Sequence, residues 1–303
     1  MIEVTEFRKE YGGFVAVEGS TFTVEPGEVF GIVGPNGAGK TTTLKAVAGL
    51  IEPTAGSLTV DSGAADDPET RRNLGFLPEE SPLYEEMTAG SYLRFFADLY
   101  DVPRDAAAGR IDDALTRLDL EHRDRRIGDM SKGMKRKVAI ARSLVNDPDV
   151  LVFDEPASGL DPLTTNYVIE FTRELSEAGK TVLFSAHNLY HVESICDRVV
   201  VMNHGTIIAR GSIDEIRERH GTTEYHVFTD VEVPDAIREN GRYLTVVDSM
   251  DDVEGIRDAA SERGGRVEDI RTEEPSLEDV FLDIAGETPE DAERASVDRE
   301  AES

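Results

Sequence analysis

The sequence predicts an α/β fold in which helices flank a mostly parallel, buried sheet, followed by a second and smaller α/β domain. Two short apolar runs, Val150–Phe153 and Thr181–Ser185, are typical of strands that are buried on both faces. Helical patterns and glycine turns alternate with strand-like runs up to about residue 218. The pattern then starts again, so we expect a separate accessory domain over residues 219–285.

The first domain is expected to begin with short strands and to pass through a glycine-rich turn into helices. Residues 84–145 look mainly helical, and Thr88 is a suitable N-cap for one of these helices. In chain order, the elements predicted before the two apolar runs are strands at Phe14–Val17, Ser20–Val24 and Glu28–Val33 and helices at Thr42–Leu50, Tyr92–Tyr100 and Ile111–Leu118.

The accessory domain is expected to mix strands with helices, and an acidic tail follows it. The predicted elements are strands at Tyr225–Phe228, Tyr243–Val247 and Arg266–Arg271, a helix near Met250–Glu262 and a helix from Ser276. Residues 286–303 carry seven acids and almost no large apolar side chains. Such a segment cannot bury enough surface to order itself, so we expect a disordered tail.

The charge of the chain is strongly negative. It has 62 acidic and 32 basic residues, a net charge of −30, and the acids are spread along the whole sequence. A field of this sign repels nucleic acid and anionic lipid, so we expect no nucleic-acid partner. As a hypothesis, we interpret the acids as the surface of a protein from a salt-loaded cytoplasm, where a Debye length of about 3 Å near 1 M salt screens self-repulsion.

No apolar stretch is long enough to cross a membrane. The longest uninterrupted runs, such as Val199–Met202, have four residues, whereas a spanning helix needs roughly 20. The N-terminus lacks the basic and apolar regions of a signal peptide. We therefore expect a cytoplasmic protein without direct membrane insertion. The single cysteine, Cys196, is expected to be a half-buried core thiol.

One segment matches the pattern G-x-x-x-x-G-K-[ST] of a phosphate-binding loop. It follows a predicted strand and precedes a predicted helix, which is the context that the pattern requires. Glycines permit positive φ angles, and successive N–H groups at a helix N-terminus bind anions. Lys40 is expected to reach the β- and γ-phosphates of a nucleotide, and Thr41 to offer its hydroxyl to Mg²⁺. The segment comprises Gly34, Pro35, Asn36, Gly37, Ala38, Gly39, Lys40 and Thr41, with Thr42 at the start of the helix.

Two carboxylates follow the apolar run Val150–Phe153. Asp154 is expected to hold Mg²⁺, directly or through water, and Glu155 to polarise the water that attacks the γ-phosphate. A strand that ends in Asp-Glu is common by itself, so this pattern depends on the phosphate-binding loop for its meaning. The two segments together would fit kinases, GTPases and many ATPases.

Three further elements narrow the class. Met130–Arg142 resembles the signature sequence of ABC proteins in a variant form, Ser158–Asp161 resembles their D-loop, and His187 lies where the family has its switch histidine. Residues 1 to about 215 therefore resemble an ABC nucleotide-binding domain. The resemblance implies a P-loop NTPase fold with a RecA-like core, an antiparallel β subdomain and a helical signature subdomain.

The resemblance also implies contacts to ATP. Tyr11 lies where an aromatic ring stacks on adenine, and the alternative is a core tyrosine at the end of a strand. Ser131 and the Gly133 amide would cap the γ-phosphate of ATP bound to the other subunit. The segment from Val138 would then be a helix whose positive end faces that phosphate.

Two more residues take their roles from the resemblance. Asp161 would communicate between the two nucleotide sites, and with Pro162 it is also a good helix start. His187 would contact the γ-phosphate and orient Glu155 or the water. His187 and His191 are four residues apart, which is one arrangement for metal binding, but the sequence offers no third ligand.

The sequence departs from the family pattern at three positions. Glu79 replaces the usual glutamine of the Q-loop, and a glutamate can still be a ligand of Mg²⁺. Lys132 and Met134 replace the usual glycine and glutamine of the signature. Because Ser131 and Gly133 are retained, we expect activity.

The segment Glu274–Leu282 resembles the C-terminal motif of exporter ATPases of the drug-resistance and sodium-extrusion type. The resemblance implies a subunit that binds and hydrolyses ATP with Mg²⁺, forms a homodimer around the nucleotide and powers a separate integral-membrane permease of the ABC-2 class. The permease would dock between Glu79 and about Tyr100, holding the subunit at the inner face of the membrane. The alternatives are a soluble ABC ATPase that acts on ribosomes or DNA and a nucleotide-dependent regulator without turnover.

Overall fold

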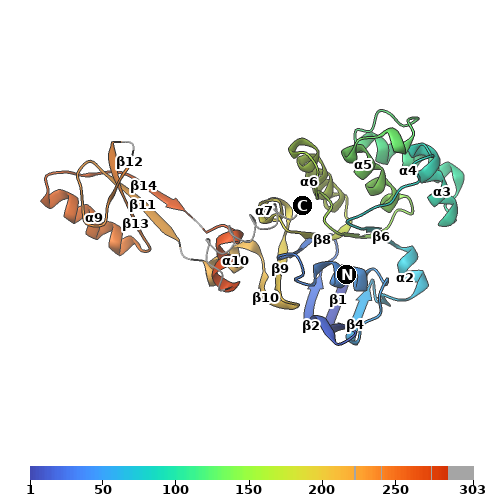
Figure 1. Cartoon of the computed structure of the whole chain (residues 1–303), viewed down its shortest axis with the longest axis horizontal. Coiled ribbons are helices and arrows are strands. Elements are labelled where there is room, and N and C mark those ends of the chain that lie inside the picture. Colours follow the sequence, from blue (N-terminus) through green and yellow to red (C-terminus); the bar gives the residue numbers. More distant parts are fainter. Residues whose placement is uncertain (222, 240, 274, 286–303) are drawn as a thin grey trace. The chain divides into compact units, whose positions relative to one another are not determined.

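The computed structural model describes residues 1–285 except 222, 240 and 274 (Figure 1). The predicted acidic tail, residues 286–303, lies outside the described residues. The chain divides into two compact units between Ser212 and Ile213. The predicted domain boundary near residue 218 falls within a helix, α8 (Ile213–His220).

A mostly parallel sheet forms the centre of the first unit, as predicted. Its strand order is β10-β9-β3-β8-β7-β6, and β10 is antiparallel to β9 while the other neighbours are parallel. Every residue of β3, β7 and β8 is buried, which explains their apolar sequences. The strands are β3 (Val29–Val33), β6 (Leu74–Leu77), β7 (Val150–Phe153), β8 (Thr181–Ala186), β9 (Arg198–Asn203) and β10 (Thr206–Gly211).

Helices α6 (Pro162–Glu177) and α7 (Leu189–Ile195) lie on one side of the parallel sheet (Figure 1). Cys196, directly after α7, is half-buried as predicted. A Cβ atom on Gly31 of β3 would lie 2.9 Å from the Cys196 sulfur, so the thiol packs closely on the sheet. Burial raises the pKa of the Cys196 thiol well above its ordinary value.

An antiparallel sheet lies on the opposite side, with the strand order β2-β1-β4-β5 (Figure 1). Two strands were predicted at Phe14–Val17 and Ser20–Val24, but the structure has one continuous strand there. At Glu18 and Gly19, where the sequence pattern indicated a break, β2 has one extra residue relative to β1, and the pairing resumes on both sides of it. The strands are β1 (Ile2–Tyr11), β2 (Phe14–Val24), β4 (Ala55–Val60) and β5 (Gly63–Ala64).

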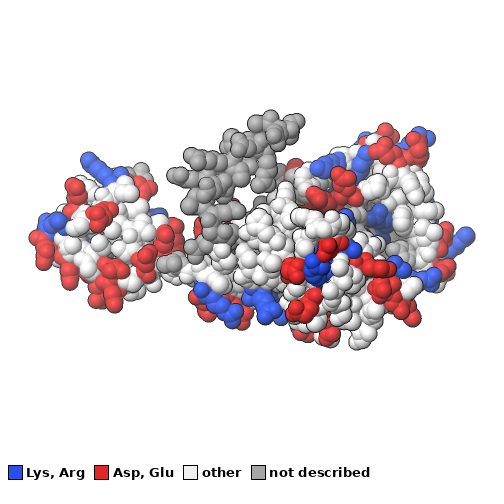
Figure 2. All heavy atoms as spheres, turned by 60° about the horizontal axis from the view of Figure 1, so that its bottom comes forward, with Lys and Arg blue, Asp and Glu red and all other residues white. Residues whose placement is uncertain are grey.

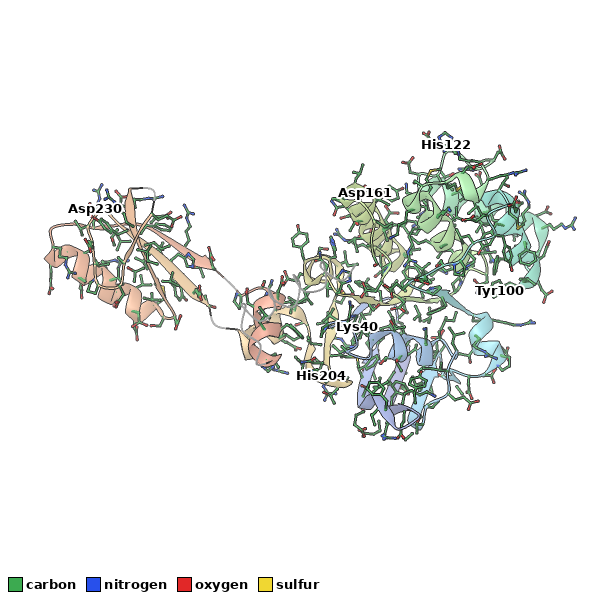
Figure 3. All side chains as sticks on the ribbon, viewed as in Figure 1. Lys40, Tyr100, His122, Asp161, His204 and Asp230 are labelled. Carbon is green, nitrogen blue, oxygen red and sulfur yellow. The ribbon has the colours of Figure 1, made fainter. Side chains whose placement is uncertain are left out.

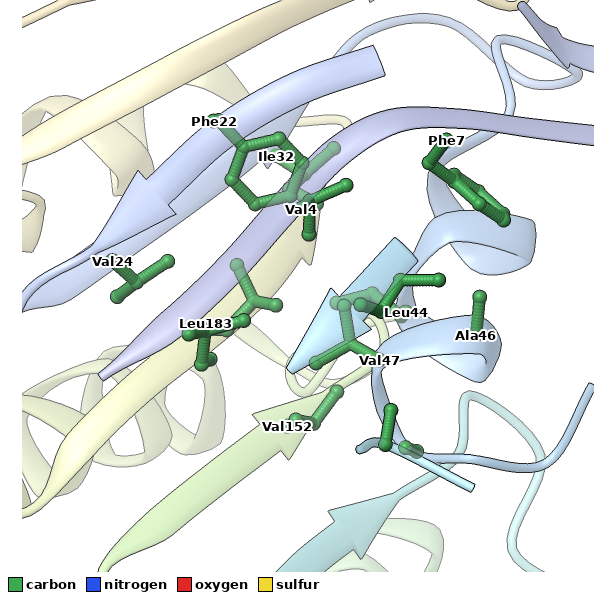
Figure 4. Packing of buried hydrophobic residues seen from close by; sticks show 14 of the residues in the cluster. Val4, Phe7, Phe22, Val24, Ile32, Leu44, Ala46, Val47, Val152 and Leu183 are labelled. Atoms are coloured by element: carbon green, nitrogen blue, oxygen red, sulfur yellow. The ribbon is translucent and has the colours of Figure 1, made fainter. Parts of the chain in front are cut away.

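The main core fills the space between these two sheets, around helix α1 (Lys40–Val47) (Figure 4). Leu44 and Val47 of α1 are fully buried beside side chains from both sheets, such as Val4 and Leu183. The helix predicted at Thr42–Leu50 starts and ends earlier. Gly49, with φ of 64°, ends it by donating its amide to the Ala46 carbonyl.

Three helices form a separate group beside β6: α3 (Ala89–Leu99), α4 (Arg104–Arg117) and α5 (Lys132–Leu144). Thr88 caps α3 as predicted, in a reciprocal capping box with Ser91. The helix predicted from Val138 begins earlier, because the Ser131 hydroxyl accepts a hydrogen bond from the Met134 amide and starts α5 at Lys132. A short helix, α2 (Pro68–Arg72), precedes the group.

The second unit contains an antiparallel sheet with the strand order β12-β13-β11-β14 and helix α9 (Met250–Glu262) on one of its faces. Each strand and helix predicted for this unit has a counterpart in the structure, with small differences at the ends, whereas β12 was not predicted. Helix α8 contacts α10 (Leu277–Ala285) in the same unit. The strands are β11 (Glu224–Thr229), β12 (Ile237–Glu239), β13 (Arg242–Val247) and β14 (Val267–Glu273).

Acidic side chains outnumber basic ones on the visible face of the described parts (Figure 2). They occur on both units, in agreement with the even spread of acids along the sequence. None of the described helices has both the length and the apolar character that a membrane crossing requires.

Candidate active site

The loop Gly34–Gly39 connects β3 to α1 and is shaped by its glycines. Gly34 has φ of 147°, and a Cβ atom there would lie 2.1 Å from the Met202 carbonyl oxygen. Gly39 has φ of 101° and no side chain to cap α1. The N–H groups of the first turn therefore point into the loop without a side-chain acceptor, which suits an anion.

Lys40 is the first residue of α1 and lies near the centre of the first unit (Figure 3). Its side chain is 6% exposed. The Nζ atom donates to the carbonyl oxygens of Gly34 at 2.7 Å and Pro35 at 3.2 Å. It also lies 3.5 Å from Oε1 of Glu155. The loop carbonyl groups thus hold the buried Lys40 ammonium group, which faces the Glu155 carboxylate.

Asp154 follows β7 and is 1% exposed. Its Oδ1 atom accepts hydrogen bonds from the Thr41 hydroxyl at 3.1 Å and the Ser185 hydroxyl at 2.7 Å. Ser185 in turn accepts a hydrogen bond from the Glu155 amide at 2.9 Å. Ser185 was not predicted as a site residue, because its contact with Asp154 depends on the pairing of β7 with β8.

Glu155 forms a close pair with His187. Its Oε2 atom lies 2.8 Å from His187 Nδ1. Burial raises the pKa of the Glu155 carboxyl, but the hydrogen bond and charge of His187, together with Lys40, act in the other direction and leave that pKa below its ordinary value. The hydrogen bond to Glu155 raises the pKa of His187, although burial opposes it. The pair therefore favours an ionised Glu155 and a protonated His187.

Lys40, Glu155 and His187 line one cavity of about 510 Å³, whereas the buried Gly34 and Asp154 are not among its lining residues. It brings together the predicted phosphate-binding loop, Glu79, Glu155 and His187. The lining residues are Phe14, Ala16, Pro35, Asn36, Gly37, Ala38, Gly39, Lys40, Thr41, Thr42, Glu79, Glu155, Ser158 and His187.

Tyr11 is not among the lining residues of this cavity. It ends β1, is 45% exposed, and its ring centre lies 4.9 Å from the Lys9 ammonium. Its partner across the hairpin is Phe14, which is 68% exposed and does line the cavity. Phe14 was not predicted as a site residue. The available signal was an aromatic residue directly after a Gly-Gly turn, close in sequence to the predicted base-stacking Tyr11.

The remaining predicted residues lie outside the cavity. Ser131 caps α5, and Asp161 caps α6 by accepting a hydrogen bond from the Thr164 amide at 3.1 Å, as its pairing with a proline predicted (Figure 3). A Cβ atom on Gly133 would lie 3.1 Å from the Thr164 side chain. The starts of α5 and α6 are thus neighbours, and neither Ser131 nor Gly133 reaches the Lys40 cavity of the same chain.

Arg136 was also missed. It lies on α5, is 8% exposed, and its guanidinium bonds to backbone carbonyl groups after β6 and after β7. Its helical spacing from the buried Ala139, Ile140 and Ser143 was the signal for a buried arginine.

The oxygen atoms at this site suit a hard cation. The Thr41 hydroxyl and the Asp154 carboxylate are hydrogen-bonded to each other, and Glu79 lines the same cavity. Hydroxyl and carboxylate oxygens are ligands that Mg²⁺ prefers. Within the described residues, no group of three or more His, Cys, Asp or Glu side chains is arranged to hold a metal ion. His187 and His191 therefore belong to no such group in this part of the chain.

Two sequence families match the chain. One, described as “ABC transporter”, matches residues 17–158, and the other, described as “ATP-binding protein DrrA1-3-like, C-terminal domain”, matches residues 211–285.

Named relatives cover most of the chain. It is 42% identical over 207 residues to the ABC transporter ATP-binding protein NatA of Bacillus subtilis (strain 168), covering 67% of this chain and 84% of NatA. It is 35% identical over 298 residues to the Nod factor export ATP-binding protein I of Rhizobium sp. (strain N33), covering 94% of this chain and 97% of that protein. Among solved structures, it is similar to the dimeric post-hydrolysis state of the ATP-binding cassette MJ0796 bound to ADP and Pi, with a TM-score of 0.63, 26% identity, and coverage of 70% of this chain and 98% of that one.

Proposed function

Because the chain belongs to the ABC transporter ATP-binding proteins, the subunits that hydrolyse ATP for a transporter, we propose that it powers export through a separate membrane permease. The family match over residues 211–285 and the export named for the Rhizobium relative support the direction of transport. We further propose that the permease is of the ABC-2 class and holds this subunit at the cytoplasmic face of the membrane.

In this proposal the Lys40 cavity holds the triphosphate of ATP. The loop amides and the first turn of α1 bind the phosphate oxygens, and the Lys40 ammonium neutralises their charge. Thr41, Asp154 and Glu79 would hold Mg²⁺, which supplies further positive charge to the phosphates. The buried position of Lys40 strengthens its attraction to the phosphates, since little water screens it.

Glu155 is the proposed general base. Its lowered pKa keeps the carboxylate ionised, so that it can accept a proton from water beside the γ-phosphate. His187 holds the carboxylate by its Nδ1 atom and is exposed enough to contact the phosphate as well. Lys40 approaches the other carboxylate oxygen, so Glu155 is held on both sides.

We propose that a second copy of the chain completes each site. Ser131 and Gly133 lie outside the Lys40 cavity of their own chain, which fits residues that act on ATP bound to another copy. Asp161 lies beside them at the start of α6 and would link the two sites. The dimeric MJ0796 structure, with ADP and Pi, is consistent with this arrangement. Loss of the bridging phosphate would then weaken the dimer.

The permease contact is proposed at the group of α3 and α4. A cavity of about 640 Å³ lies between these helices, lined by side chains such as Phe95 and Ile111. Exposed Tyr84 and Leu99, at 55% and 59%, extend the apolar surface. This surface overlaps the predicted region from Glu79 to Tyr100 and extends beyond it onto α4, and it suits an amphipathic helix of the permease.

The paired contacts of Glu155 with Lys40 and His187 are the observation that carries the proposed hydrolysis. We expect Glu155→Gln to keep ATP binding but to reduce phosphate release by about 10²-fold or more, because the amide cannot accept the proton. The same variant should accumulate as a dimer with ATP and Mg²⁺. Phosphate release and size-exclusion chromatography measure the two effects.

Lys40→Ala is the control for nucleotide binding, since it removes the charge that the loop presents to the phosphates. It should lose ATP and the dimer together. Unchanged hydrolysis by Glu155→Gln would contradict the proposed base. If the chain serves a transporter, it should co-purify with a membrane protein from solubilised membranes. Co-purification with ribosomes instead would favour a soluble ABC ATPase.

A further inference from the structure

The side chain of Arg136 joins two segments that carry site residues. Its guanidinium donates to the carbonyl oxygens of Pro78 at 2.8 Å and Glu79 at 2.9 Å, after β6. It also donates to the carbonyl oxygens that follow β7. Those distances are 3.0 Å for Asp154, 2.9 Å for Glu155 and 2.7 Å for Pro156. One side chain therefore holds the backbone at all three proposed carboxylate residues, Glu79, Asp154 and Glu155.

The chemistry of this contact is specific to arginine. A guanidinium offers five N–H donors in a rigid plane, whereas an ammonium group offers three from one atom and an amide offers two. Arg136 is only 8% exposed, and burial lowers its pKa to about 10, so the group remains charged at neutral pH. Burying a charge on backbone carbonyls costs free energy, which points to a requirement for position rather than to filling of the core.

Arg136 also links these two backbone segments to the N-terminus of α5, where Ser131 lies. Ser131 is the N-cap of α5 and Arg136 lies little more than one turn further along, so a rigid helix moves both together. Close packing between α5 and β6 also fixes the position of the helix. A Cβ atom on Gly75 of β6 would lie 2.3 Å from the Ser143 carbonyl oxygen of α5, so only glycine allows this approach.

We propose that Arg136 is a positioning residue that couples the placement of the α5 serine end to the placement of Glu155 and Glu79. When a second copy seats Ser131 and Gly133, Arg136 transmits the position of α5 to the backbone that carries the base. This inference rests on the proposed hydrolytic function. Arg136 bonds to the three carboxylate residues at their backbone carbonyl groups and not at their carboxylates, so it acts through the backbone that it holds.

The test compares two substitutions of Arg136 with a matched control in the full chain. Arg142 lies on the same helix, donates to the Tyr92 hydroxyl at 3.1 Å and stacks on Phe96. These contacts do not involve the backbone segments after β6 and β7 that Arg136 holds. Each variant, R136Q, R136K and R142Q, is measured for ATP affinity, for kcat and KM of phosphate release, and for its unfolding midpoint in urea.

We expect R136Q to lower kcat by about 10- to 100-fold while its ATP affinity stays within about threefold, because a misplacement of about 1 Å at a catalytic group costs that much. R136K should recover part of kcat, since it keeps the charge and some of the bonds. R142Q should keep kcat within about twofold even where its unfolding midpoint falls as far as that of R136Q.

Normal kcat in R136Q would overturn the inference. So would a fall in kcat that R142Q reproduces at equal stability, because that pattern indicates a structural role only. If R136Q does not fold, R136K replaces it: a lower kcat with unchanged ATP affinity supports the inference, and a normal kcat contradicts it. Absence of phosphate release from the unsubstituted chain with ATP and Mg²⁺ would contradict the proposed function itself, a result distinct from any ranking of the variants.

Discussion

Glu155 has a backbone conformation that non-glycine residues rarely adopt, with φ of 46°. Three hydrogen bonds hold its backbone: the amide donates to the Ser185 hydroxyl, and the carbonyl accepts from Arg136 and from the Ser158 amide. Backbone strain of this kind typically persists where surrounding contacts over-determine the position. From this conformation the carboxylate contacts both Lys40 and His187.

The pairing of Glu155 with His187 predicts a pH dependence at the residue scale. The pKa of His187 should lie above its ordinary value of about 6.5, and Glu155→Gln should lower it, because the carboxylate is the main cause of the shift. His191 is an internal comparison, since burial and then the charge of His187 lower its pKa. NMR titration of the imidazole C–H signals measures both residues.

The sign of the effect on stability follows from the two shifts. The contribution of His187 is complete below about pH 6.5 and is lost as pH rises through its raised pKa. The contribution of Glu155 is present above its unfolded pKa of about 4.5 and is lost as pH falls through its lowered pKa. The pair therefore stabilises the fold most between about pH 4.5 and 6.5. A His187 that titrates below His191 would contradict the pair.

The hairpin of β1 and β2 sets the rim of the cavity at the element scale. Gly12 and Gly13 both have positive φ angles, which permits a tight turn between Tyr11 and Phe14. The two aromatic side chains are cross-strand partners, so they project from the same face of the sheet. An exposed phenylalanine at the mouth of a nucleotide site is explained if the base covers it.

We expect Phe14→Ala to weaken ATP binding by about 5- to 100-fold, the range that a stacked ring contributes. Binding of tripolyphosphate should not change, because that ligand has phosphates but no base. Tyr11→Ala is the matched substitution on the facing strand and tests the predicted contact of Tyr11 with adenine. Equal losses for ATP and tripolyphosphate would show damage to the loop instead of a lost stack. Isothermal titration measures each affinity.

Elements buried by their own apolar runs were predictable from the sequence. β7 matches its prediction and α9 matches in the second unit, because a run of buried residues or a regular helical spacing sets their limits. The starts of α1 and α5 could not be predicted in this way. Gly39 in an unusual conformation sets the start of α1, and the Ser131 hydroxyl sets the start of α5. Local backbone geometry, more than hydrophobic pattern, fixes such boundaries.

The candidate site was predictable where one continuous motif carries it. The loop from Gly34 to Thr41 and the pair Asp154 and Glu155 needed no knowledge of the fold. Ser185 and Arg136 could not be assigned, because their partners come from strands and helices that are distant in the sequence. The helical spacing indicates that Arg136 is buried, but no pattern of side-chain types shows which backbone carbonyl groups it contacts.

The charge of the whole molecule leads to a prediction about salt. With a net charge of −30, repulsion between acids destabilises the folded chain in dilute buffer. The Debye length falls from about 10 Å at 0.1 M to about 3 Å at 1 M, so KCl should raise the unfolding midpoint over this range. Thermal unfolding followed by circular dichroism measures it.

A non-ionic solute separates screening from general solvent effects. Sucrose stabilises folded proteins by exclusion from their surface but does not screen charge. Most of the stabilisation should therefore be specific to KCl. Full stability in dilute buffer, with no further gain in KCl, would refute the interpretation of the acidic surface as an adaptation to salt.

The close packing of the Cys196 thiol has a practical consequence for following the proposed dimerisation in solution. Maleimide reagents attack the thiolate, and the raised pKa together with packing against Gly31 keeps that form scarce and shielded. The native chain is thus already close to a cysteine-free background for labelling. A fluorophore attached to a new cysteine at an exposed position such as Leu163, 81% accessible at the start of α6, would report on the approach of a second copy without removal of the natural residue.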